Sequence, residues 1–160
     1  MNDPLGTYLA DHLAGAMHAI EVLNNIRSQY GEQPLGQFAR NILKEVETDR
    51  DTLKELAERV GSGSSKVKET AAWVAEKFSR LKLSHDPANS IGTFEALEFL
   101  VLGIHGKLVL WHALASVSSD DSRLQCMDHQ RLIARAESQY ASVEEHRLSL
   151  ARSALYRRSV

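Results

Sequence analysis

Eight positions between residues 35 and 60 recur at alternating gaps of four and three residues. This spacing places all eight on one face of an α-helix, which is typical of a helix packed against other helices. Seven of these side chains are hydrophobic, and the eighth is a carboxylate. The row consists of Leu35, Ala39, Ile42, Val46, Asp49, Leu53, Leu56 and Val60. A chain with this row has to bury a helix face and accommodate one acidic group in or beside the core.

Comparable patterns predict helices at about residues 4–30, 34–60, 65–82, 91–117 and 120–156. Gly31 ends the first, because glycine readily adopts the conformation that closes a helix. Ser119 and Asp120 are candidates to cap the last. No stretch alternates between polar and apolar residues with a period of two, so no sheet is expected. We therefore predict a single all-α domain over residues 1–160.

The connections between these helices predict their arrangement. The first and second helices, and likewise the last two, are joined by only a few residues, which favours antiparallel neighbours. A much longer segment, with the short helix 65–82 inside it, joins the two hairpins. This order predicts a four-helix bundle with one long crossover. An up-down-up-down bundle with an inserted helix is the alternative.

The composition narrows the class of protein. The net charge of −2 is not that of a general nucleic-acid-binding protein, which is usually basic. Cys126 is the only cysteine, which favours a reducing compartment. The chain starts without the basic and apolar regions of a signal peptide, and the apolar stretch 99–115 is too short and too interrupted for a bilayer span. We therefore expect a cytoplasmic protein with no transmembrane segment and no nucleic-acid partner.

The segment "FARNILKEVETDRDTLKELAERVG" resembles the second helix of small bacterial ferritin-like proteins, especially the stress-associated group. The resemblance implies a ferritin-like four-helix bundle and a bacterial, stress-related setting. It also implies two metal ions in the bundle core. In that family two helices each supply a Glu, and the other two each supply a Glu-x-x-His pair that binds iron or manganese.

This sequence departs from the family pattern because it contains no Glu-x-x-His. The nearest match is Glu144-x-x-Arg147, and an arginine side chain cannot ligate a metal because it stays protonated. Arg147 also falls on the apolar row of its helix. One hypothesis is that Asp49 faces Arg147 as a buried ion pair in place of the metal centre. The alternative is that Asp49 lies at the edge of its row and reaches solvent.

A surviving metal site would have to use an irregular set of ligands. The candidates are His12, Asp49, His105 and Glu144, with iron or manganese as the metal. Glu98, His105 and His112, spaced by seven residues, are either a metal or proton-transfer row or a set of boundary side chains. Lys107 is expected either to pair with an acidic side chain or to extend outward into solvent.

These observations favour a non-catalytic bundle without a bound cofactor that acts as a structural or protein-interaction module. The alternative is an active ferritin-like metalloprotein, either an iron or manganese oxidase or a peroxide-handling enzyme. The helix predicted at 91–117 is apolar on all sides, which is typical of a helix that is buried centrally or packs on a second subunit. Gly103 and Gly106 would permit close approach of a neighbouring backbone to this helix, and we expect a homodimer through it.

Overall fold

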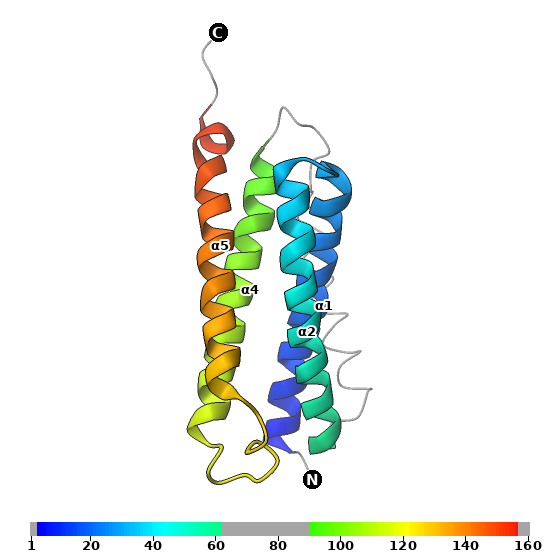
Figure 1. Cartoon of the computed structure of the whole chain (residues 1–160), viewed down its shortest axis with the longest axis vertical. Coiled ribbons are helices and arrows are strands. Elements are labelled where there is room, and N and C mark those ends of the chain that lie inside the picture. Colours follow the sequence, from blue (N-terminus) through cyan, green and yellow to red (C-terminus); the bar gives the residue numbers. More distant parts are fainter. Residues whose placement is uncertain (1–2, 62–89, 157–160) are drawn as a thin grey trace.

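The computed structural model describes residues 3–61 and 90–156, and within these ranges helices joined by turns make up the fold, with no strand. This confirms the all-α prediction. The short helix predicted at 65–82 lies outside the described residues. Figure 1 shows four long helices side by side. They are α1 (Pro4–Tyr30), α2 (Pro34–Val60), α4 (Ile91–Ser116) and α5 (His129–Leu155).

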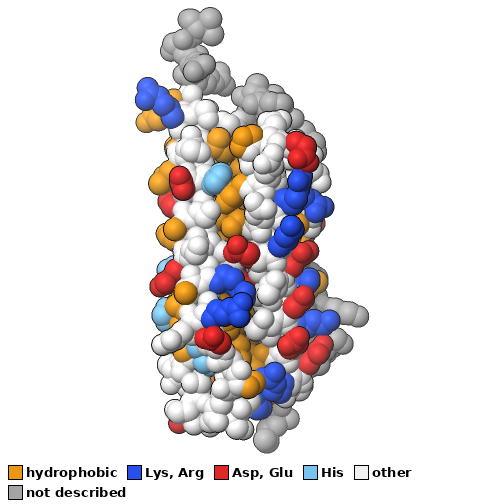
Figure 2. Space-filling model, viewed as in Figure 1, with side chains coloured by type: hydrophobic (Ala, Val, Ile, Leu, Met, Phe, Trp, Pro, Cys, Tyr) orange, Lys and Arg blue, Asp and Glu red, His pale blue; other side chains and the backbone are white. Residues whose placement is uncertain are grey.

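The helices form two antiparallel hairpins, α1 with α2 and α4 with α5, which lie against each other mainly through α1 and α4. α2 and α5 approach each other more sparsely, and Figure 2 shows hydrophobic side chains along the seam between them. α2 and α4 are diagonal to each other, and their backbones do not adjoin. Both start at the same pole of the bundle and run in the same direction (Figure 1).

Local side-chain and glycine chemistry sets the ends of α1 and α2. The Asp3 carboxylate accepts a hydrogen bond from the Leu5 amide at 3.1 Å and caps α1. Gly31 and Gly61 follow the two helices with φ values of 53° and 84°, which few other residues tolerate. A Cβ at Gly36 would lie 2.2 Å from the Gly31 carbonyl oxygen. Glycine at position 36 therefore lets the turn between the two helices close tightly.

The last helix begins later than the sequence suggested. It starts at His129 rather than near Ser119, and residues 117–128 form turns. The Asp121 carboxylate accepts hydrogen bonds from the backbone and the guanidinium of Arg123, which favours a turn over a helix here. Asp128 then caps α5 by accepting from the Arg131 amide at 3.0 Å.

The buried hydrophobic side chains form two groups, one towards each pole of the bundle. On α2 the first group ends at Val46 and the second starts at Leu53, with Asp49 between them. The same division occurs on α4 around Lys107 and on α5 around Gln139. Three helices therefore contribute a polar side chain at the level where the apolar core is interrupted.

By length and composition alone, α4 could cross a membrane, and it is the one such helix within residues 3–61 and 90–156. The core helix of a bundle in water passes the same test, so this property does not separate the two settings. Phe94, Leu97, Leu100, Ile104 and Trp111 on α4 are buried against the other helices.

Candidate functional site: a buried charge cluster

Asp49 lies inside the bundle, with 2% of its surface exposed. The four-three spacing of its row therefore places it in the core, and the solvent-facing alternative is not what the structure has. An unpaired carboxylate at this depth would carry a desolvation cost of several kcal/mol. The core can therefore hold the Asp49 carboxylate only if other side chains pair with it.

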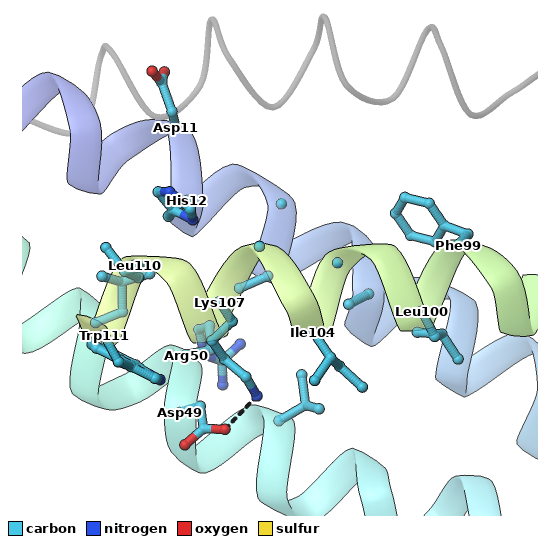
Figure 3. A pocket seen from close by; sticks show the side chains of 17 residues that line it. Asp11, His12, Asp49, Arg50, Phe99, Leu100, Ile104, Lys107, Leu110 and Trp111 are labelled. Atoms are coloured by element: carbon cyan, nitrogen blue, oxygen red, sulfur yellow. Dashed lines mark hydrogen bonds and ion pairs between the residues drawn. The ribbon is translucent and has the colours of Figure 1, made fainter. Parts of the chain in front are cut away.

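Two cations face Asp49, one from each helix of the opposite hairpin. The Lys107 ammonium of α4 donates a hydrogen bond to Oδ2, and Figure 3 shows the side chain extending from α4 to the carboxylate. The Arg135 guanidinium of α5 forms an ion pair with Oδ1. The two contacts connect α2 to both helices of the second hairpin.

Gln139 completes the cluster, and only 1% of its surface is exposed. Its amide oxygen accepts a hydrogen bond from the Lys107 ammonium. Its amide nitrogen donates to Asp49 Oδ2 at 3.2 Å and to Glu45 Oε2 at 3.0 Å. The amide therefore connects a cation to two carboxylates. Its oxygen acts as an acceptor and its nitrogen as a donor, as the chemistry of each atom requires.

The cluster contains two acidic and two basic side chains, so its formal charges balance. Burial lowers the pKa of Lys107, and the nearby Asp49 carboxylate opposes that change. Asp49 Oδ1 and Arg135 Nε nevertheless have no hydrogen-bond partner among the described residues. The Arg135 contact is therefore a close approach of opposite charges without the two-bond fork that arginine can form with a carboxylate.

Arg147 lies elsewhere, so the pairing expected for it has to be corrected. Its guanidinium donates to both carboxylate oxygens of Glu144, at 2.6 and 2.7 Å, and to Glu98 at 3.1 Å. The bonds from Arg147 lower the pKa of Glu144. Arg147 is twelve residues beyond Arg135 on α5, which is about 18 Å along a helix axis. This axial offset places it at the level of the start of α4, away from Asp49.

The candidate metal ligands do not form a site. Within the ranges that the structure describes, no three His, Cys, Asp or Glu side chains come together in a way that could hold a metal ion. The His12 ring packs edge-on against Tyr8, and burial lowers the pKa of His12. The His105 ring is 6.0 Å from the ring of Tyr140, and Glu144 is bonded to Arg147 as described above.

Glu98, His105 and His112 all lie on the exposed side of α4. The carboxylate of Glu98 is bonded to Arg147. Their seven-residue spacing therefore forms a row along the surface of the bundle rather than a row of ligands in its core.

A cavity of about 280 Å³ lies beside the cluster, between α1, α2 and α4. Lys107 and Asp49 border it, and Figure 3 shows His12 and Trp111 in its wall. Gly103 and Gly106 also line it, and a Cβ at either would meet no described atom within 4 Å. In the described part of the chain, these glycines leave open space instead of allowing a neighbouring backbone to approach closely.

Arg135 and Gln139 are members of the cluster that sequence reasoning missed. An apolar row that includes Arg147 passes through Tyr140, whose side chain is exposed. Leu132, Ala136, Gln139 and Val143 have gaps of four, three and four, and all four are buried. The regular spacing was therefore a usable signal, and following it would have placed an amide in the core.

The described residues form an all-α bundle of four helices with a charge-balanced polar layer inside it. No protein-family model, curated protein or solved structure matches this chain.

Proposed function

We propose that this chain is a ferritin-like bundle with a long crossover between α2 and α4, in which the buried charge cluster takes the place of a di-metal centre. It would act as a structural or protein-interaction module without a catalytic metal. The observation that carries this proposal is the contact of Asp49 with both Lys107 and Arg135.

The direction of the helices supports the ferritin-like order. α2 and α4 run parallel (Figure 1), so Gly61 and Ser90 lie at opposite poles of the bundle. The connection must therefore cover the length of α4, whose 26 residues span about 39 Å. In an up-down-up-down bundle α4 would run opposite to α2 and could follow it after a short turn.

The chemistry of the cluster supports the loss of metal binding. Lys107 and Arg135 supply positive charge where a ferritin-like protein would hold cations, and protonated amines and guanidinium groups have no lone pair to donate. The Gln139 amide nitrogen donates to Glu45 and to Asp49 within the cluster. A metal ion entering here would have to displace both cations and leave them buried without partners, which is costly.

The test is metal analysis of protein loaded with Fe(II) or Mn(II) without oxygen and then desalted. We expect no stoichiometric metal in the wild type and no difference from Asp49→Asn. About two ions per chain, lost in Asp49→Asn, would overturn the proposal and support the alternative of an active ferritin-like metalloprotein.

We propose a second copy of this chain as the interaction partner, in contact with α4. Leu102 and Val109 are seven residues apart on one face of this helix and are 66% and 50% exposed. Burial of both side chains against the same surface of a second copy would stabilise a dimer. Light scattering after size-exclusion chromatography should give a dimer that Leu102→Glu with Val109→Glu converts to a monomer. Leu148→Glu on α5 serves as the control, and a wild-type monomer would contradict the dimer.

A further inference from the structure

The cavity beside the charge cluster lies at the level where the apolar core is interrupted. α1 contributes Gly15 and Ala16 there, whereas α2, α4 and α5 contribute longer polar side chains. A Cβ at Gly15 or Gly103 would meet no described atom within 4 Å. Residues without side chains on two facing helices therefore leave room between α1 and α4, and this room opens to the surface at Gly103, which is exposed.

The walls of this cavity are mainly apolar. They come from side chains such as Val46, Leu53, Leu100 and Ile104. A cavity of about 150 Å³ with such walls can hold benzene. The 280 Å³ available here is nearly twice that volume and suits a molecule of two fused rings.

One polar group in the wall has no partner. The indole nitrogen of Trp111 is buried in a side chain with 0% of its surface exposed, and no acceptor for its hydrogen is present among the described residues. Buried indole N–H groups usually find an acceptor, because an unpaired buried donor destabilises the folded state. Trp111 lies one helical turn after Lys107, and both side chains extend from α4 towards α2 (Figure 3).

We propose that this cavity binds a small, mainly apolar aromatic alcohol whose hydroxyl oxygen accepts a hydrogen bond from Trp111 Nε1. The apolar walls select the ring system. The indole, which can only donate, selects an oxygen that accepts. A hydroxyl can also donate, and the Asp49 carboxylate, which is paired with Lys107 and Arg135, borders the same cavity and can accept a further hydrogen bond. This ligand site goes beyond the proposed structural role and is independent of metal binding.

The test compares 1-naphthol with naphthalene, which has the same rings without the hydroxyl. Titration is followed in nitrogen-15 NMR spectra by the indole N–H resonance of Trp111, which Trp111→Phe assigns, and by the backbone amide resonances, which report binding in the variants as well. We expect saturable binding of both probes, with 1-naphthol bound about tenfold more tightly. Trp111→Phe removes the hydrogen-bond donor and should bring the affinities for 1-naphthol and naphthalene close together. Removing a polar group elsewhere should leave the difference between these two affinities unchanged.

Filling the cavity gives the second arm of the test. Gly103→Leu should lower the affinity for both probes at least about tenfold. Gly15→Leu fills the cavity from α1 and should have the same effect if Gly103→Leu folds poorly. Ala113→Leu on the exposed side of α4 is the matched control and should leave binding unchanged. Absence of saturable binding to the wild type would overturn the proposal. Equal binding to the filled variants would also overturn it.

Discussion

Lys107 of α4 bonds to Asp49 of α2 across the diagonal of the bundle, although the backbones of these two helices do not adjoin. The contact joins a helix of one hairpin to a helix of the other. Apolar packing between hairpins tolerates small axial shifts, because hydrophobic attraction is not directional. A buried ion pair that also bonds to Gln139 can be formed in only a narrow range of offsets. We infer that the cluster fixes the register between the two hairpins.

Removing the charge of Asp49 should destabilise the fold strongly. Asp49→Asn leaves Lys107 and Arg135 buried without their counter-charge, and breaking such a pair costs about 3–5 kcal/mol. The free energy of unfolding in urea measures this loss. Asp51→Asn on the exposed side of α2 removes a surface pair with Arg50 and should cost less than about 1 kcal/mol. Equal effects of the two changes would contradict the cluster.

Arg147 should be energetically independent of Asp49. Its partners are Glu144 and Glu98, which lie well away from the cluster. The effects of Arg147→Met and Asp49→Asn on the free energy of unfolding should therefore add to within about 0.5 kcal/mol in the double variant. A coupling clearly larger than this would place Arg147 in the cluster after all.

The same substitution at two helical glycines should change stability in opposite directions. Gly103→Ala places a methyl group in open space and should stabilise by up to about 1 kcal/mol, because alanine is the better helix former. Gly36→Ala should destabilise, since its Cβ would meet the Gly31 carbonyl oxygen. Thermal unfolding of the two variants beside the wild type measures both effects, and shifts of the same sign would argue against this packing.

Stability should depend on pH through Lys107. Burial lowers the pKa of this amine in the folded chain, while in the unfolded chain it returns to its ordinary value of 10.5. Between these two values the unfolded chain binds more protons, so the free energy of unfolding should rise as the pH rises. Urea melts from about pH 8 to 10.5 on wild type and Lys107→Met measure this. An identical pH slope in the two proteins would show that Lys107 does not contribute it.

The sequence was sufficient to predict the four described helices apart from the start of α5, and for Asp49 it left a buried position and a solvent-reaching position open. Apolar rows with gaps of three and four located α1 and α2, and Gly31 and Gly61 fixed where they end. The same row raised the possibility of a carboxylate in the core, and the structure decides in favour of burial. The turns before α5 were not predicted, because Asp121 and Asp128 can break or cap a helix as well as Ser119 and Asp120 can. The side-chain hydrogen bonds of Asp121 and Asp128 decide where α5 begins.

The partners of Asp49 could not be predicted from spacing within one helix. Periodicity gives the face on which a residue lies, but the axial offset between helices depends on how the hairpins pack. Arg147 was on a suitable face at the wrong level. Lys107 had been expected either to pair with an acid or to reach solvent, and only the fold brings Asp49 within its reach.

The most direct measurement is a double-mutant cycle on the diagonal pair. Asp49→Asn, Lys107→Met and the combination of both are unfolded in urea under one set of conditions. A buried pair predicts that the double variant is more stable than the sum of the single effects allows, with a coupling of about 1 kcal/mol or more. Single effects that simply add would show that the two side chains do not hold the hairpins together.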